Sequence, residues 1–342
     1  DRLEHLTAAS SATGRLTKIK ASVNKKGLIE ALDYDQIDDV GAYPRAPEPA
    51  SLYRMHGNLS GAYKVKNIKC RNRVVLTNKT PSGLNRGFGG PQHYFALERL
   101  VHQIAVELNL NVLDVIKVNL LEKKQFPYKS PSGALLDSGD FQKLVRKVVK
   151  SSTYKNILKK KNNAIKKGKI YGIGYSAIIE PSISNMGYVT TALPYKDREK
   201  TGHKGGALAS TSVSIGPTGS VYVTCDSLPQ GQGHKTILSQ IVADVFGIKI
   251  NDIFVNTTHD THKDAWSIAA GNYSSRFAGA VAGSAFNAAN NLKKKLQKIA
   301  ASQLNCKSEN IRFDTGKVYD KKNSDNYLNF KRLAGIPHWS PE

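Results

Sequence analysis

The first half of the chain combines short stretches of strand-like patterning with one long amphipathic stretch. Residues 15–23 (RLTKIKASV) alternate polar and apolar positions, which is typical of a half-buried strand. A turn at Lys25-Lys26-Gly27 follows, and residues 28–34 (LIEALDY) are expected to complete a hairpin. Residues 64–77 predict another pair of short strands. Residues 93–108 (HYFALERLVHQIAVEL) place apolar side chains at helical spacing and therefore predict a helix.

A glycine-rich turn, Arg86-Gly87-Phe88-Gly89-Gly90-Pro91-Gln92, leads into this helix. Pro91 suits the first helical position, where its missing N–H is no loss. The glycines let the backbone approach a ligand closely, and the unpaired amides of a helix start favour an anion or an electron-rich oxygen. Arg86 adds a cation and Phe88 an aromatic face. The same turn also fits a structural role in packing the helix on a sheet, so the pattern alone leaves both readings open.

The remainder of the first half ends in a strongly basic stretch. Residues 112–121 predict a short helix, and Ser138 or Asp140 is expected to cap a helix over 141–149. Residues 151–169 then carry seven lysines and no acidic residue. A nucleic-acid patch is one interpretation, but the span has no arginine and only one aromatic residue. We favour a solvated helix and linker here, which is also the clearest domain boundary.

The second half repeats the order of strand, glycine-rich loop and helix. Strands are predicted at 171–179, 207–215, 220–224 and 250–257. The loop Pro229-Gln230-Gly231-Gln232-Gly233-His234-Lys235-Thr236 opens onto an amphipathic helix over 237–246, with Gly247 at the expected C-terminal cap. The loop lacks the GK[ST] of a nucleotide P-loop and the GxGxxG of a Rossmann site.

A third loop, residues 269–276, precedes an Ala-rich helix predicted over 278–301. Ser274, Ser275 and Arg276 at its end offer hydroxyl and guanidinium donors for an anion. Serine capping beside an exposed arginine is the structural alternative. Taken together, three donor-rich loops at helix starts indicate a phosphorylated or oxo-rich ligand that is held mostly by backbone.

Composition narrows the class of protein. A length of 342 residues with 40% hydrophobic residues predicts two ordinary domains with real cores. The formal net charge of +23 is compatible with nucleic acid, an anionic ligand or acidic partner subunits. Three cysteines that are far apart form no metal or disulfide framework, which favours a reducing compartment and predicts a cytoplasmic protein. No stretch is apolar enough to predict a membrane span.

Several motifs together carry a family resemblance. RGFGGPQ, GQGHKT with its following helix, GNYSSR, DRLEHLTA and LLDSGDF resemble the molybdenum-binding large subunit of the xanthine oxidase family. That family includes aldehyde oxidoreductases, xanthine dehydrogenases and aerobic carbon monoxide dehydrogenases. The resemblance runs through essentially the whole chain. It implies an α+β fold with two mixed α/β molybdopterin-binding domains, each with sheets covered by helices and both incomplete at the chain ends.

The resemblance also assigns roles to residues. Arg86 and Phe88 are expected at the reaction centre, where Arg86 orients or polarises the substrate and Phe88 stacks on it. The residues expected to hold the molybdopterin cofactor belong to the three loops: Gly87, Gly89, Gly231, Gln232, Gly233, His234, Thr236, Ser274, Ser275 and Arg276. No side chain is expected to bind molybdenum directly, because the pterin holds it. Carbon monoxide dehydrogenases carry a copper-binding Cys directly after the Arg, and Gly87 stands at that position here.

The implied enzyme is an oxidoreductase that adds water-derived oxygen to an aldehyde or an N-heterocycle. Its cofactor is molybdopterin, with the cytosine dinucleotide form as one option, and its electrons pass to 2Fe-2S and FAD on partner subunits. An iron–sulfur small subunit, an FAD medium subunit and a dimer of heterotrimers are expected, with no nucleic acid and no membrane.

The chain is expected to be an internal fragment. The predicted division is a first domain over 1–150, a basic linker over 151–170 and a second domain over 171–342. The family's catalytic glutamate is expected outside the chain, so the chain alone is predicted to be inactive. An empty scaffold fragment and a basic nucleic-acid-binding protein remain as alternatives.

Overall fold

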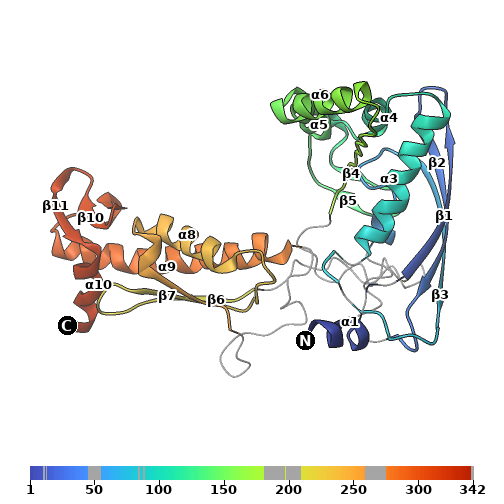
Figure 1. Cartoon of the computed structure of the whole chain (residues 1–342). Coiled ribbons are helices and arrows are strands. Elements are labelled where there is room, and N and C mark those ends of the chain that lie inside the picture. The colour runs from blue at the N-terminus through green and yellow to red at the C-terminus, as the bar shows by residue number, and fades with distance from the viewer. Residues whose placement is uncertain are drawn as a thin grey trace. The chain divides into compact units, whose positions relative to one another are not determined.

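The computed structural model describes residues 1–10, 12, 14–44, 55–83, 85–87, 89–180, 197, 209–258 and 275–339. The chain packs as two units. The first contains Asp1–Glu180 and Gly187–Gly202, and the second contains Pro181–Met186 and His203–Glu342 (Figure 1).

The first unit is built on a three-stranded sheet that follows the short helix α1 (Arg2–Ala8). Strands β1 (Gly14–Val23) and β2 (Ile29–Asp39) form the predicted antiparallel hairpin. Strand β3 (Asn67–Val75) pairs with β2 in parallel. The prediction of two short strands over 64–77 was therefore wrong: this span forms one edge strand, because it pairs with β2 in one continuous register from Asn67 to Val75.

Helix α3 (Gly90–Glu107) lies over this sheet, and its apolar face makes much of the core (Figure 1). The side chains of Leu97 and Val101 are fully buried with Tyr34 of β2. Helix α4 (Val112–Asn119) confirms the second predicted helix. It ends in Asn119, whose buried side chain accepts from the Ile29 amide at 2.8 Å and so secures the hairpin turn.

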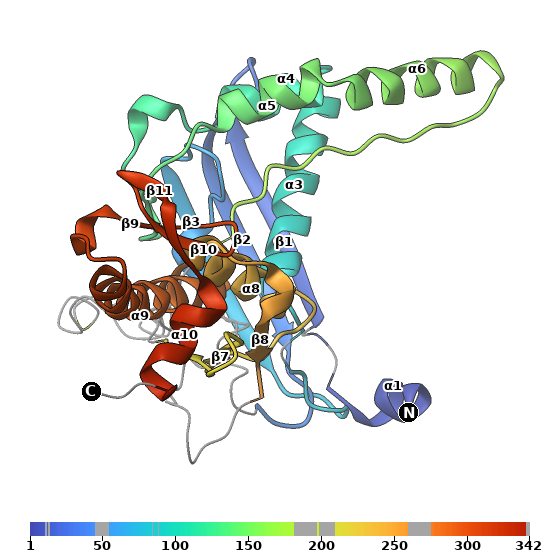
Figure 2. The ribbon, with the colours of Figure 1, turned by 90° about the vertical axis from the view of Figure 1, so that its left-hand side faces the viewer.

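The predicted cap and the basic helix are both confirmed. The first unit continues through two 3-10 turns, η1 (His56–Asn58) and η2 (Lys123–Gln125), and a small hairpin, β4 (Tyr128–Lys129) and β5 (Leu135–Leu136). Asp140 caps α5 (Phe141–Lys150) by accepting from the Lys143 amide at 2.9 Å. The lysine-rich span forms α6 (Ser152–Lys166), which buries no residue and projects away from α3 in Figure 2.

Residues 171–180 form no strand, which corrects the prediction of a strand over 171–179. The segment is extended and returns along α3 (Figure 2), with every second residue half-buried. Its alternating pattern arises because one face packs on a helix rather than in a sheet. The domain limits 1–150, 151–170 and 171–342 remain a prediction, while packing groups 171–180 with the first unit.

The second unit has a sheet of the same design as the first. Strands β6 (Thr211–Ile215) and β7 (Val221–Cys225) are antiparallel, and β8 (Ile253–Asn256) is parallel to β7. Helix α8 (His234–Phe246) makes the β7–β8 crossover, and η5 (Ile250–Asp252) leads into β8. A π-helical turn, η7 (Phe277–Val281), runs into the long helix α9 (Ala282–Gln303). Helices α8 and α9 share one core with β7, centred on Val223, Leu238 and Ala285.

The unit closes with elements that the sequence pattern did not predict. They are η8 (Ser308–Asn310), an antiparallel meander of β9 (Ile311–Asp314), β10 (Lys317–Asp320) and β11 (Asn323–Asn329), and α10 (Phe330–Trp339). The predicted fold class of two mixed α/β domains is confirmed. None of the helices in the described part of the chain is both long and apolar enough to cross a membrane.

Candidate cofactor-binding site

The glycine-rich turn of the first unit leads directly into α3. Gly87 and Gly89 adopt φ angles of 94° and 76°, which L-residues with side chains rarely adopt. The Gly90 amide donates to the Gly87 carbonyl at 2.9 Å and closes the turn. Helix α3 begins at Gly90 with Pro91 in its first turn, as the pattern predicted. Arg86 is exposed, and Phe88 lies outside the described residues.

A cavity of about 650 Å³ lies beside this turn, on the surface of α3. Gly87, Gly90 and Pro91 line one part of it, and the 171–180 segment lines another. Between them, Tyr94, Glu98 and His102 follow each other at four-residue spacing on α3. The cavity therefore connects the predicted reaction-centre loop to the groove that holds the extended segment.

These three side chains hold alternate residues of the segment. The hydroxyl of Tyr94 donates to the Ile179 carbonyl, and a Glu98 oxygen accepts from the Ala177 amide at 3.0 Å. The His102 Nε2 lies 2.8 Å from the Tyr175 carbonyl oxygen. Because four helical residues rise about as far as two extended residues, the two elements stay in register.

Glu98 is a functional candidate that sequence reasoning missed. Its side chain is buried and accepts from the Tyr63 hydroxyl at 3.0 Å on both oxygens. Loss of hydration raises the pKa of Glu98 to about 7, against the two hydrogen bonds that favour its ionised form. The available signal was a lone carboxylate between Leu97 and Leu100 on the apolar face of a predicted helix.

The glycine-rich loop of the second unit leads into α8 in the same way. Gly231 and Gly233 adopt φ angles of 94° and 78°. Gly231, Gln232, Gly233 and Thr236 are all exposed. Within the loop, the Gln232 side-chain carbonyl accepts from the Gln230 amide.

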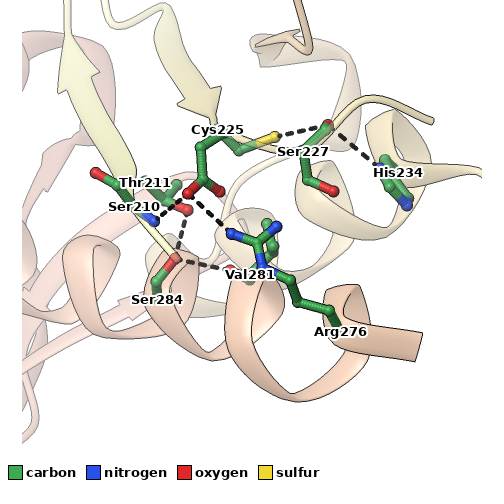
Figure 3. Close-up of polar contacts among 9 residues, drawn as sticks. Ser210, Thr211, Cys225, Ser227, His234, Arg276, Val281 and Ser284 are labelled. Carbon is green, nitrogen blue, oxygen red and sulfur yellow. Dashed lines mark hydrogen bonds and ion pairs between the residues drawn. The ribbon is translucent and has the colours of Figure 1, made fainter. Parts of the chain in front are cut away.

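His234, in contrast, faces inward. Its ring is buried and lies parallel to the Phe277 ring at a centroid distance of 3.8 Å. Figure 3 shows its contact with Ser227, whose carbonyl oxygen lies 3.4 Å from His234 Nδ1. Burial lowers the pKa of His234, so the neutral imidazole is favoured. The neutral His234 ring, which donates its Nδ1–H to the Ser227 carbonyl, is suited to anchor the end of the glycine-rich loop. It is not suited to supply a positive charge to a bound anion.

Arg276 is also buried. Its guanidinium donates to Asp226 Oδ2 at 2.9 Å, and the same oxygen accepts from the Ser210 amide at 3.0 Å (Figure 3). The exposed side chain predicted by the structural alternative is thus not found, since Arg276 shows no exposure. Ser275 is exposed with φ of 57°, and Ser274 lies outside the described residues. Direct cofactor contacts of these three residues remain a prediction.

The caps distinguish these two helices from others in the chain. The caps of α4, α5 and α6 are Asn111, Asp140 and Ser151. Each of these side chains accepts a hydrogen bond from a first-turn amide at 2.9 to 3.1 Å. The cap residues of α3 and α8 are Gly89 and Gly233, which have no side chain to do so. The first-turn amides of α8 therefore suit an external acceptor such as a phosphate or an oxo group, whereas at α3 the Gly90 amide already donates to the Gly87 carbonyl and Pro91 has no N–H.

This donor set fits an anionic organic cofactor better than a bare metal ion. Among the described residues, no group of three or more His, Cys, Asp or Glu side chains could hold a metal ion. Metal cations need such oxygen, nitrogen or sulfur ligands, whereas the two loops present backbone N–H groups.

Family models match both halves of the chain. A molybdopterin cofactor-binding domain model matches residues 147–340, and a second model of that description matches residues 1–120. The chain belongs to the molybdopterin cofactor-binding domain family. The predicted resemblance to the molybdenum-binding subunits of the xanthine oxidase family is thereby confirmed.

Curated relatives agree with this membership. The chain is 28% identical to the nicotine 6-hydroxylase large subunit of Paenarthrobacter nicotinovorans over 92% of this chain and 37% of the relative. It is also 28% identical to the carbon monoxide dehydrogenase large chain of Afipia carboxidovorans over 100% of this chain and 42% of the relative. The chain thus spans about two fifths of the length of these relatives.

Solved structures show the same fold. Quinoline 2-oxidoreductase from Pseudomonas putida 86 superimposes with a TM-score of 0.81 and 26% identity over 99% of this chain and 42% of that chain. The CO dehydrogenase from Oligotropha carboxidovorans gives a TM-score of 0.78 and 26% identity over 100% of this chain and 42% of that chain.

Proposed function

We propose that this chain is the molybdopterin-binding part of a longer molybdenum hydroxylase subunit. The activity proposed is oxidation of an aldehyde or an N-heterocycle with oxygen derived from water. The observation that carries the proposal is the pair of glycine-led helix starts, α3 and α8, in a chain that family models match in both halves. The start of α8 presents backbone donors without a side-chain cap, which is what a phosphorylated pterin needs, and the start of α3 places its glycine-rich turn beside a cavity.

The residues of the chain have distinct roles in this proposal. Gly231, Gln232 and Gly233 hold the pterin and phosphate end with Thr236 close by, while Gly87 and Gly89 keep the first loop close to the cofactor. Ser274 and Ser275 add hydroxyl donors. Arg86 orients the substrate by its charge, and Phe88 stacks on it. The bound cofactor supplies the oxygen-transfer and redox chemistry, and no residue of this chain binds the metal itself.

The proposed substrate class depends on the residue that follows Arg86. Relatives of the chain are named for nicotine, quinoline and carbon monoxide. Gly87 follows Arg86, at the place where the resemblance expects a copper-binding cysteine in carbon monoxide dehydrogenases. The three cysteines of the chain form no disulfide and are distant from Arg86 in sequence. We therefore favour hydroxylation of an aldehyde or N-heterocycle over copper-dependent oxidation of carbon monoxide.

The working enzyme is proposed to need partners. An iron–sulfur subunit and an FAD subunit would accept the electrons, in a dimer of heterotrimers in the cytoplasm. The cytosine dinucleotide form of the cofactor and a catalytic glutamate outside this chain belong to the same proposal. The net charge of +23 is assigned to docking of these partners. A salt titration with duplex and single-stranded DNA tests the nucleic-acid alternative, which retains support only if binding persists at moderate ionic strength.

A matched pair of glycine substitutions tests the cofactor site. Gly233 and Gly168 have φ of 78° and 66°, and a Cβ on either would meet no atom within 4 Å. Gly233→Ala and Gly168→Ala should therefore each cost about 1–2 kcal/mol in backbone strain. Only Gly233→Ala should lower the molybdenum and pterin content after production in a host that makes the cofactor. Equal molybdenum content in both variants would contradict the assignment of this loop.

The proposed role of Arg86 is tested separately. Arg86→Ala, assayed with the partner subunits present, should keep its molybdenum and lose turnover by about a hundredfold, as expected for one electrostatic contact to a reacting group. Loss of molybdenum together with turnover would place Arg86 in cofactor binding instead.

A further inference from the structure

Two contacts fix the ends of the Gly231–Gly233 loop to one place in the second unit. At the entrance, Asp226 accepts from Arg276 at 2.9 Å. At the exit, the His234 ring stacks on Phe277 at 3.8 Å with an interplanar angle of 5°. Arg276 and Phe277 are consecutive, at the start of the π-helical turn η7. Both ends of the loop are thus held by neighbouring residues: Arg276 ends the third predicted cofactor loop, and Phe277 directly follows it.

The entrance and exit are also joined to each other. The Ser227 carbonyl oxygen lies 3.4 Å from His234 Nδ1 and accepts from the Cys225 thiol at 3.5 Å (Figure 3). The loop between them, residues 228–233, is exposed throughout. The loop is therefore a short exposed span whose two ends are joined through the buried residues Ser227 and His234.

The Asp226–Arg276 ion pair is poorly suited to increase the free energy of unfolding. Asp226 is 4% exposed and Arg276 is not exposed, while Asp226 Oδ1 has no hydrogen-bond partner in the described part of the chain. A buried pair that leaves an oxygen unsatisfied often adds little stability over an apolar replacement. A directional N–H···O contact does, however, fix the relative position of two segments, which an apolar contact does not.

We propose that Asp226, Arg276, His234 and Phe277 are positioning residues that hold the 228–233 loop in its ligand-ready conformation before the cofactor binds. The inference rests on the proposed function for its biological meaning, but the loop conformation itself is measurable without any cofactor. Pre-ordering of this kind raises affinity because less conformational freedom is lost on binding.

Hydrogen exchange of the cofactor-free chain tests the proposal. The double variant Asp226→Asn/Arg276→Met removes both charges, so a purely structural pair predicts wild-type exchange once folding is retained. Loop positioning predicts instead that amides of residues 226–237 exchange about tenfold faster or more, with α9 unchanged. Asp244→Asn, on the exposed side of α8, is the matched control. Wild-type exchange over 226–237 in the double variant would overturn the proposal.

A second variant covers the case in which exchange rises throughout the unit. Phe277→Leu keeps an apolar side chain and removes only the ring stack on His234. Faster exchange confined to 226–237 supports positioning, and no local change overturns it. Molybdenum content is then measured on the same proteins. A wild-type chain that binds no molybdenum while the exchange results hold would defeat the proposed function and leave the positioning role standing.

Discussion

The two helix starts share a glycine cap but are supported in different ways. The start of α3 adjoins a groove where Tyr94, Glu98 and His102 hold an extended segment through hydrogen bonds to its backbone. The start of α8 is held by the Asp226–Arg276 ion pair and the His234–Phe277 stack. Glycine occupies the cap position of both helices, exposed at α8 and buried at α3, and the two starts differ further in the buried side chains behind them.

This difference predicts different sensitivities. The α3 support includes a carboxyl group with a pKa of about 7, so it should respond to pH near neutrality. The α8 support concentrates charge in one buried contact, so it should respond most to loss of a single partner.

The largest effect is expected from Arg276→Met. The variant leaves the buried Asp226 carboxylate without its cation, which should lower the free energy of unfolding by about 3–5 kcal/mol. Arg73→Met is the control, because Arg73 bonds Asp35 at 2.6 Å with both side chains partly exposed. Its cost should be about 0–1 kcal/mol. Urea unfolding of both variants measures the difference, and equal costs would remove the distinction between the buried pair and a surface pair.

A smaller loss is expected from Tyr63→Phe behind α3. It removes the hydroxyl that donates to both oxygens of Glu98, and should cost about 1–3 kcal/mol because a buried acceptor loses its donor. Tyr34→Phe is the comparison, since the Tyr34 hydroxyl donates at 2.9 Å to a neutral carbonyl, that of Leu59. Thermal unfolding at neutral pH should rank Tyr63→Phe as the more damaging change, and the reverse order would argue against a special role for Glu98.

The pH response is isolated by Glu98→Gln. Because the folded pKa is about 7 and the ordinary value is 4.5, the folded chain retains a proton that the unfolded chain releases between these values. The contribution of Glu98 to stability therefore falls as pH rises through this window and is constant above it. Stability of Glu98→Gln relative to wild type should rise over the same window and then level off.

The difference in denaturant midpoint between Glu98→Gln and wild type is measured at each pH. Groups that titrate in both proteins, such as His234, contribute equally to both and cancel in this difference. Glu107→Gln, at the exposed end of α3, should give a flat difference. Parallel pH profiles for Glu98→Gln and wild type would show that the carboxyl group titrates normally.

The smallest effect is expected from Phe277→Leu. Loss of the parallel ring contact with His234 should cost about 1 kcal/mol, on the scale of an aromatic pair. Phe254→Leu, which removes the exposed stack on Tyr222, is the comparison and should cost less. Thermal unfolding of the two variants checks the order.

Local patterns predicted the parts of the molecule that local physics determines. The 3.6-residue spacing after Pro91 gave α3, the alternation over 15–23 gave β1, and Asp140 is one of the two caps predicted for α5. The glycine-rich turns could be predicted because glycine adopts positive φ angles at little cost.

Contacts between distant segments could not be predicted in this way. An extended segment that packs one face on a helix shows the same polar and apolar alternation as a strand in a sheet. The pattern over 171–179 therefore could not distinguish the two, and the predicted strand was wrong. Asp226 and Arg276 are fifty positions apart, and nothing in either neighbourhood marks the other. The β9–β11 meander depends on its packing against α9 and α10, which periodicity does not encode.

Molybdenum and organic phosphate analysis of the purified wild-type chain is the most direct test of the central claim. The chain is produced in a host that makes molybdopterin, beside a full-length relative handled identically. Cofactor binding by this chain predicts near-stoichiometric molybdenum and phosphate, with both lowered in Gly233→Ala and retained in Gly168→Ala. A folded wild-type chain with neither molybdenum nor phosphate, while the relative carries both, would contradict it.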